Sequence, residues 1–169
     1  GDAEMARESL KEINEDLAEL ERIVDDVLMA ARLSLREDTP GASTGPQLRA
    51  QPVDVAALLR KSIARFRSAH PERPIEAELP ADLPLLSADP VLLRRVVDNL
   101  LENAHKYTEE PHRPVELAAA QAGGAVTIVV RDHGMGIAAD DLERVFEPFF
   151  RADRSRTRAT GGLGLGLAL

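Results

Sequence analysis

The chain has 169 residues, 44% of them hydrophobic and 3% aromatic, so it is long enough for a folded domain with an aliphatic core. It has no cysteine, which excludes disulfides and cysteine–metal sites, and it has no apolar run or N-terminal signal that predicts membrane insertion or secretion. The formal net charge of −8 argues against general nucleic-acid binding.

Residues 1–38 predict one long helix that pairs with other helices. Apolar side chains recur there in alternating steps of three and four residues, at Leu10, Ile13, Leu17, Leu20, Val24, Val27 and Ala31. The stripe is narrow and its flanks are heavily charged, which favours a bundle or coiled coil; packing on the chain's own domain is the alternative. The run EDTPGASTGPQ (Glu37–Gln47) then concentrates Thr, Pro, Gly and Ser, so residues 39–51 are predicted to be a linker.

After the linker, the spacing of apolar residues predicts a helix over Val53–Phe66 and a short strand over Pro74–Pro80. Asp89 is suited to cap a second helix and Pro90 to occupy its first position. We expect this second helix to continue to about Tyr107.

Two strands follow, over Pro114–Gln121 and Gly124–Asp132, joined as a hairpin by Gly123 and Gly124. The order helix, strand, helix, hairpin predicts an α+β sandwich with the helices on one face of a sheet.

The stretch DNLLENAHKY (Asp98–Tyr107) places Asn99 and Asn103 one turn apart on the second predicted helix. Asparagine is a poor helix former because its side chain competes with the backbone for hydrogen bonds. Two of them on one face therefore indicate a task other than helix stability.

Two further stretches are weak signals when taken singly. DHGMGI (Asp132–Ile137) puts a carboxylate at a strand end beside two glycines, where a ligand can approach the backbone; such a turn usually only closes a loop. FEPFFR (Phe146–Arg151) gathers three of the four phenylalanines, which more often fill a core.

The glycine-rich run GGLGLGLAL (Gly161–Leu169) leads into an apolar helix start, where backbone N–H groups and the helix dipole can hold phosphate oxygens. A flexible linker is the alternative, but it would leave the intervening leucines exposed. The nearby arginines, Arg144, Arg151, Arg154, Arg156 and Arg158, suit a local anion better than a long polyanion.

The order and spacing of four stretches resemble the motifs of the sensor histidine kinases, which share a superfamily with gyrase, Hsp90 and MutL. The stretches are NLLENAHKY for the N box, DHGMGI for the first glycine box, FEPFFR for the F box and GGLGLGLAL for the second glycine box. The resemblance implies a Bergerat-type ATP-binding fold, with helices on one face of a mixed sheet, over residues 52–169. Leu17–Leu33 resembles the second helix of the dimerisation hairpin, so residues 1–38 are expected to be a dimerisation helix.

The resemblance implies that ATP and Mg²⁺ are bound, with the Asn103 amide oxygen as the metal ligand. Hydrolytic relatives carry a water-activating Glu one turn earlier, where this chain has Asn99, so transfer to an acceptor is favoured over hydrolysis. Lys106 is expected to contact a phosphate and Tyr107 to lie against the adenine. Asn99, Asn103 and Lys106 are therefore the expected catalytic residues.

Asp132 is expected to accept a hydrogen bond from the adenine amine, which distinguishes ATP from GTP, while Gly134 and Gly136 let the base approach the backbone. Arg154 or Arg156 either contacts the γ-phosphate or is a solvated charge of the lid. The implied nucleotide site also includes Ile137, Phe146, Gly162, Gly164, Leu165 and Gly166.

Two departures from the family pattern concern the acceptor and the ends. None of the four histidines, His70, His105, His112 and His133, lies in an H-E-x-x-T-P-like context, so we expect the phosphoacceptor outside this sequence. The domain is expected to be truncated after the second glycine box. Leu163 also stands where the family often has a small hydroxyl residue.

The sequence therefore predicts a histidine kinase fragment that transfers the ATP γ-phosphoryl to a histidine and then to a response regulator aspartate. A homodimer through the N-terminal helix, a cytoplasmic location, and membrane contact only through segments outside this sequence are expected. A non-catalytic ATP-sensing module and an anti-sigma-type serine kinase remain alternatives; the heptad helix counts against the second.

Overall fold

The computed structural model describes residues 49–150 and 166–168, together with the single positions Met5, Ser9, Leu10, Ile13, Leu17, Leu20 and Val24. All seven single positions are helical, as predicted. The five that belong to the predicted apolar seam, Leu10 to Val24, are 53–60% exposed. Val27, Ala31 and most of the predicted linker lie outside the described residues.

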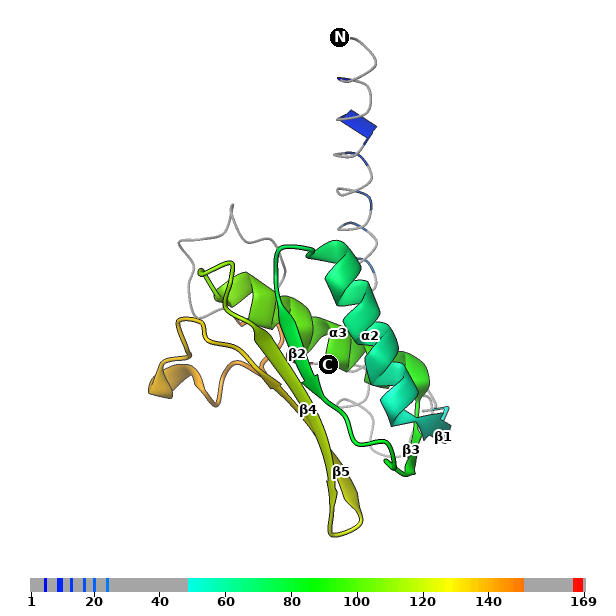
Figure 1. The fold of residues 1–169 in the computed structure, drawn as a ribbon. Helices are drawn as coiled ribbons and strands as arrows, with labels where there is room; N and C mark the ends of the chain where they lie inside the picture. Colours follow the sequence, from blue (N-terminus) through cyan, green and yellow to red (C-terminus); the bar gives the residue numbers. More distant parts are fainter. Residues whose placement is uncertain are drawn as a thin grey trace.

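The described elements are β1 (Gln51–Asp54), α2 (Val55–Ala69), β2 (Ile75–Glu78), β3 (Leu85–Ala88), α3 (Pro90–Tyr107), β4 (Val115–Ala122), β5 (Ala125–Arg131) and a 3₁₀ turn at Ala139–Asp141 (Figure 1). Strands β2, β4 and β5 form a mixed sheet in that order, in which β2 is parallel and β5 antiparallel to β4. Strands β1 and β3 form a separate antiparallel pair. The predicted α+β class is confirmed.

Both helices begin at aspartate caps. Asp89 Oδ1 accepts hydrogen bonds from the backbone N–H groups of Val91 and Leu92, at 2.9 and 3.3 Å, and Pro90 follows it. Helix α3 therefore starts and ends where the sequence predicted. Asp54 Oδ1 caps α2 by accepting from the N–H of Ala57 at 2.8 Å.

Strands β1 and β3 were not predicted from the sequence. The first predicted helix begins at Val55 instead of Val53, because Val53 and Asp54 pair with Leu86 and Leu85 of β3. Each of these strands has four residues and finds its partner more than thirty residues away along the chain. The pairing depends on a tertiary contact, so no local sequence pattern indicates it.

The core lies between the two helices and one face of the sheet (Figure 1). Buried side chains on α2 and α3 recur at helical spacing, and those on β4 recur at every second residue. The cluster consists of Val55, Leu59, Ile63, Phe66, Ile75, Val97, Leu101, Ala104, Val115, Leu117 and Ala119. The cluster members on α3 occupy one face of that helix and leave the opposite face for other contacts.

The predicted hairpin is confirmed. Gly123 and Gly124 have φ values of +57° and +80°, which suit a two-residue turn with both central residues in the left-handed region. The turn pairs Ala122 with Ala125 and sets the register of the whole β4–β5 ladder.

Candidate functional site

Helix α3 carries its polar residues opposite its buried ones. Asn99, Asn103 and Lys106 are spaced by four and three residues and are half-buried. At 100° per residue they lie on the side away from the core members Val97 and Leu101. The N box therefore presents one polar face that the hydrophobic core does not occupy.

The second glycine box meets this face. The Asn99 side-chain N–H donates to the carbonyl oxygen of Gly166 at 3.3 Å, and a Cβ on Gly166 would lie 3.8 Å from the Asn99 side chain. Residues 67 positions apart in the sequence are thus in direct contact. Arg154, Arg156, Gly162, Gly164 and Leu165 lie outside the described residues.

The first glycine box meets the C-terminal end of the same helix. The N–H of Met135 donates to the carbonyl oxygen of Tyr107 at 3.4 Å. A Cβ on Gly134 would lie 2.2 Å from that same oxygen, so only glycine fits there. Gly136 has a φ of +72°, a conformation that glycine adopts without strain.

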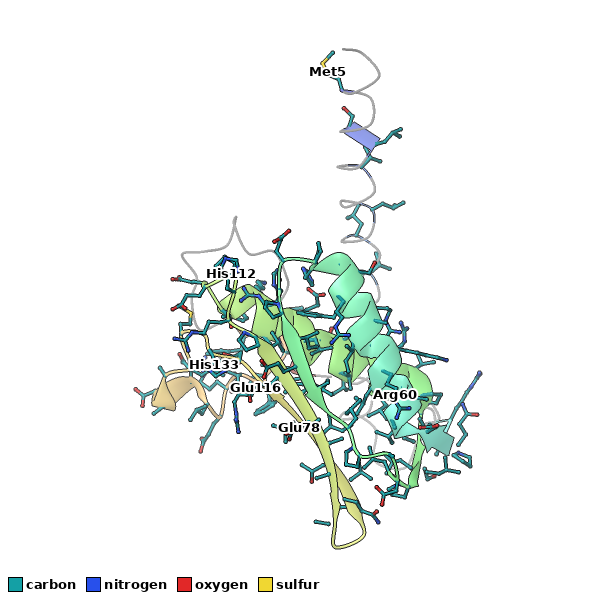
Figure 2. All side chains as sticks on the ribbon, in the orientation of Figure 1. Met5, Arg60, Glu78, His112, Glu116 and His133 are labelled. Atoms are coloured by element: carbon teal, nitrogen blue, oxygen red, sulfur yellow. The ribbon has the colours of Figure 1, made fainter. Side chains whose placement is uncertain are left out.

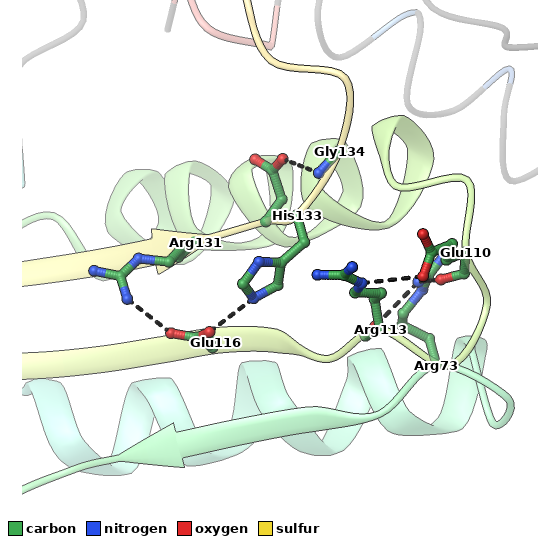
Figure 3. Close-up of polar contacts among 8 residues, drawn as sticks. Arg73, Glu110, Arg113, Glu116, Arg131, His133 and Gly134 are labelled. Atoms are coloured by element: carbon green, nitrogen blue, oxygen red, sulfur yellow. Dashed lines mark hydrogen bonds and ion pairs between the residues drawn. The ribbon is translucent and has the colours of Figure 1, made fainter.

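Asp132 lies directly after β5, and its Oδ1 accepts a hydrogen bond from the N–H of Gly134 at 2.9 Å (Figure 3). This bond fixes the carboxylate against its own turn. A carboxylate has two oxygens and about four lone-pair positions, so Asp132 retains capacity to accept from a ligand.

Apolar and aromatic side chains near this turn are open to solvent. Tyr107 and Ile137 are 43% and 47% exposed, and Phe146, farther along the chain, is 63% exposed. The ammonium of Lys106 lies 5.5 Å from the ring centroid of Tyr107, so these neighbours on α3 are close enough for a cation–π contact. The structure thus brings a cation and exposed apolar surface to the end of the helix where the glycine turn lies.

The FEPFFR segment does not fill the core, so that alternative is not supported. Phe146 and Phe149 are both more than 60% exposed, and Phe149 has a φ of 65°. Phe150 is half-buried, with the Arg144 guanidinium 4.3 Å from its ring centroid.

His105, between Asn103 and Lys106, is a packing residue. Its ring stacks on His70 at a centroid distance of 3.8 Å and meets Phe66 edge-on at 6.2 Å. Burial, followed by the influence of His70 and Arg73, lowers the pKa of His105. The neutral imidazole is favoured in this environment.

A charged cluster that the sequence analysis did not single out supports the strand leading to Asp132. Glu116 on β4 accepts from His133 at 2.8 Å and from Arg131 at 3.1 Å (Figure 3). Glu116 and Arg131 are register partners across the predicted hairpin, so counting outward from Gly123 and Gly124 could have found this pair. The hydrogen bond from His133, and then the charge of Arg131, lower the pKa of Glu116.

We expect this cluster to make stability depend on acid pH. Because the pKa of Glu116 in the folded chain is below its ordinary value of 4.5, its contribution is present above that value and is lost as the pH falls through the folded-state pKa. Thermal unfolding should show Glu116→Gln to be less stable than the unmodified chain at neutral pH, with the difference disappearing well below pH 4.5.

The matched control is Glu78→Gln, an exposed carboxylate on β2 (Figure 2). It should lack this pH-dependent difference. A Glu116→Gln deficit of the same size at both pH values would contradict an ionic role for the cluster.

The donor set fits Mg²⁺ held together with a nucleotide. The described residues contain no group of three or more His, Asp or Glu side chains that could hold a metal by themselves. Mg²⁺ usually keeps several waters and shares its remaining positions between one or two protein oxygens and substrate phosphates. The half-buried amide of Asn103, beside the contact between Asn99 and Gly166, meets that requirement.

Comparison with known proteins agrees with the family resemblance that the sequence motifs indicate. Residues 88–169 match the family described as "Histidine kinase-, DNA gyrase B-, and HSP90-like ATPase". The chain is 34% identical to sensor protein RstB of Escherichia coli (strain K12) over 157 residues, which are 93% of this chain and 34% of RstB. The chain spans between 26% and 39% of the length of the curated relatives it matches.

Two solved structures are also similar. Full-length ShkA in complex with AMPPNP has a TM-score of 0.67 and 35% identity, covering 88% of this chain and 29% of that one. The mycobacterial sensor histidine kinase MprB has a TM-score of 0.61 and 32% identity, covering 70% of this chain and 75% of that one.

In the described part of the chain, no helix is both long and apolar enough to cross a membrane. The N box lies on α3 and the first glycine box follows β5 of the mixed sheet, while one face and one end of α3 contact the second and the first glycine box respectively. With the family match and the relatives above, the chain belongs to the sensor histidine kinase family and carries its catalytic domain.

Proposed function

We propose that this chain comprises a dimerisation helix (1–38), a linker (39–51) and the catalytic ATP-binding domain (52–169) of a two-component histidine kinase. The observation that carries the proposal is the position of α3: Asn99 contacts Gly166 of the second glycine box, and Tyr107 contacts Met135 of the first. The similarity to ShkA, solved with the ATP analogue AMPPNP, supports binding of an adenine nucleotide.

Adenine is read at the first glycine box in this proposal. Asp132 accepts from the exocyclic amine, while its own turn stays fixed through the bond from Gly134. Tyr107 and Ile137 lie against the base; their exposed fractions of 43% and 47% leave apolar surface for it to cover. Gly134 and Gly136 keep the backbone open to close approach.

The phosphates lie along the polar face of α3. The amide oxygen of Asn103 is the protein ligand for Mg²⁺, and Lys106 contacts a phosphate as a point charge. Bound Mg²⁺ would supply neutralisation of the charge on the transferring phosphoryl group. Phe146, Arg154, Arg156, Gly162, Gly164, Leu165 and Gly166 complete the proposed nucleotide site.

The reaction is transfer to a histidine. A neutral imidazole nitrogen attacks the γ-phosphorus with its own lone pair, the bond from phosphorus to the bridging oxygen breaks, and its electrons remain on the β-phosphate of ADP. Asn99 cannot act as a base toward water, which suppresses hydrolysis. We propose an acceptor histidine outside this sequence because none of the four histidines lies in an H-E-x-x-T-P-like context; three of them are also engaged within the domain, since His70 and His105 are stacked on each other and His133 is bonded to Glu116.

The proposed partners follow from the remaining features. The exposed, helical positions from Leu10 to Val24 would pair in a homodimer, since an apolar seam is stabilised by burial against another helix. The phosphoryl group passes from the histidine to the aspartate of a response regulator. The domain is proposed to be cytoplasmic, with any membrane attachment through segments outside this sequence.

Titration of the chain with Mg·ATP and Mg·GTP tests the proposal. We expect ATP to bind more tightly by roughly ten- to hundredfold, the value of one hydrogen bond to a charged group. Asp132→Asn should remove most of this preference, because an amide can present a donor where an acceptor is needed. Asp140→Asn is the control, an exposed aspartate in the 3₁₀ turn.

Equal binding of ATP and GTP by the unmodified chain would remove the adenine role of Asp132. A loss of the preference in both variants would show that the effect comes from overall charge.

A further inference from the structure

Arg73 is a buried cation outside the family motifs. It lies just before β2 and is 6% exposed. Its own N–H donates to the carbonyl oxygen of His70 at 3.0 Å, which closes the turn after α2. A buried guanidinium is costly unless its donors are satisfied, so its partners show what it holds.

Those partners are acceptors at the end of α3 and in the loop that follows. One terminal nitrogen donates to the carbonyl oxygens of Thr108 at 2.7 Å and His105 at 3.5 Å. The other donates to those of Arg113 at 3.1 Å and Glu110 (Figure 3), and Nε donates to Nδ1 of His105 at 3.2 Å.

Two of these hydrogen bonds, to the carbonyls of His105 and Thr108, engage the C-terminal end of α3, and those to Glu110 and Arg113 engage the loop that follows. The last four carbonyls of an α-helix have no intrahelical donor, and its C-terminal end carries partial negative charge. Arg73 donates hydrogen bonds to these carbonyls and also places a positive charge at the negative end of the helix. Its planar guanidinium reaches several carbonyls that one ammonium could not.

The carbonyls that Arg73 holds flank the one that contacts the first glycine box. His105 and Thr108 stand on either side of Tyr107. The Tyr107 carbonyl accepts from Met135 and lies so close to Gly134 that a side chain there would not fit. A shift of the backbone at His105 or Thr108 therefore moves the surface on which the first glycine box is seated.

We infer that Arg73 is a positioning residue of the nucleotide site: it clamps the end of α3 so that Tyr107 and Asp132 keep the spacing that the adenine requires. This inference rests on the proposed function. A positioning role differs from a purely structural one in its consequence: replacing Arg73 should reduce adenine selectivity in a chain that remains folded.

The test uses two variants. Arg73→Lys keeps the charge and loses the fork, and Arg73→Gly leaves a space that added guanidinium ion can enter. In titrations with Mg·ATP and Mg·GTP, both variants should lose about tenfold or more in ATP affinity, with the ATP to GTP ratio falling toward one. Guanidinium chloride, far below its denaturing range, should restore part of the ratio in Arg73→Gly.

Arg67→Lys is the matched control, since Arg67 donates to one backbone carbonyl, that of Ile75, at 3.3 Å. It should keep the ratio of the unmodified chain. Guanidinium should leave Asp132→Asn unchanged, because that variant lacks the acceptor itself. Circular dichroism of each variant measures whether it is folded.

The outcomes separate the two proposals. If the unmodified chain does not prefer ATP to GTP, the proposed function fails. If the unmodified chain prefers ATP and the folded Arg73 variants keep that preference, the positioning role is overturned. Unfolding of both variants, with no recovery by guanidinium, would also overturn it by making Arg73 purely structural.

Discussion

Alanine in place of Gly134 is expected to reduce ATP affinity by about a hundredfold or more. The added Cβ would lie 2.2 Å from the carbonyl oxygen and 2.8 Å from the carbonyl carbon of Tyr107, distances that real Cβ atoms do not reach. Both contacts are backbone atoms at the end of α3, so the glycine turn must move instead. A moved turn takes Asp132 and the base-contacting surface out of position, and loss of one hydrogen bond to a charged group alone costs roughly ten- to hundredfold in affinity.

Isothermal titration with Mg·ATP measures this effect, and thermal unfolding measures the accompanying loss of stability, about 1–3 kcal/mol for overpacking. Gly123→Ala is the control. A Cβ there meets nothing within 4 Å, and its φ of +57° introduces backbone strain at the hairpin turn only. It should reduce stability and leave ATP affinity unchanged. Unaltered ATP binding by Gly134→Ala would contradict the seating of the first glycine box on α3.

Loss of phosphoryl transfer on replacing Asn103 with alanine is the second large effect expected. The measurement uses a longer protein that supplies the acceptor histidine, in the same chain or through a mixed dimer. With γ-labelled ATP, it should form an acid-labile, base-stable phosphoryl label on that histidine. Asn103→Ala removes the proposed Mg²⁺ ligand and should reduce the labelling rate by about a thousandfold or more.

Gln121→Ala is the control, because it removes an exposed amide at the end of β4, away from α3. Residues 1–169 alone should stay unlabelled and release phosphate slowly. Stoichiometric labelling of these residues on serine would favour the serine-kinase alternative. ATP binding without any transfer in the longer protein would favour the non-catalytic sensing module.

Features set by local chemistry could be predicted from the sequence. Asp89 and Pro90 satisfy or remove donors at a helix start wherever the helix packs, so the start of α3 followed from neighbouring residues. Gly123 and Gly124 supply the positive φ values of a two-residue turn, which determined the hairpin and its register. The motif order identified the family, because its residue types and spacings are specific.

Contacts between distant residues were decided only by the tertiary structure. Strands β1 and β3 are too short to carry a pattern, and each is stabilised by pairing with the other. The contact of Asn99 with Gly166 depends on how the chain returns to α3. Arg73 has no distinguishing sequence signal: the hydrogen-bond acceptors for its side chain lie 32 to 40 residues away and converge on it only when the end of α3 folds beside β2.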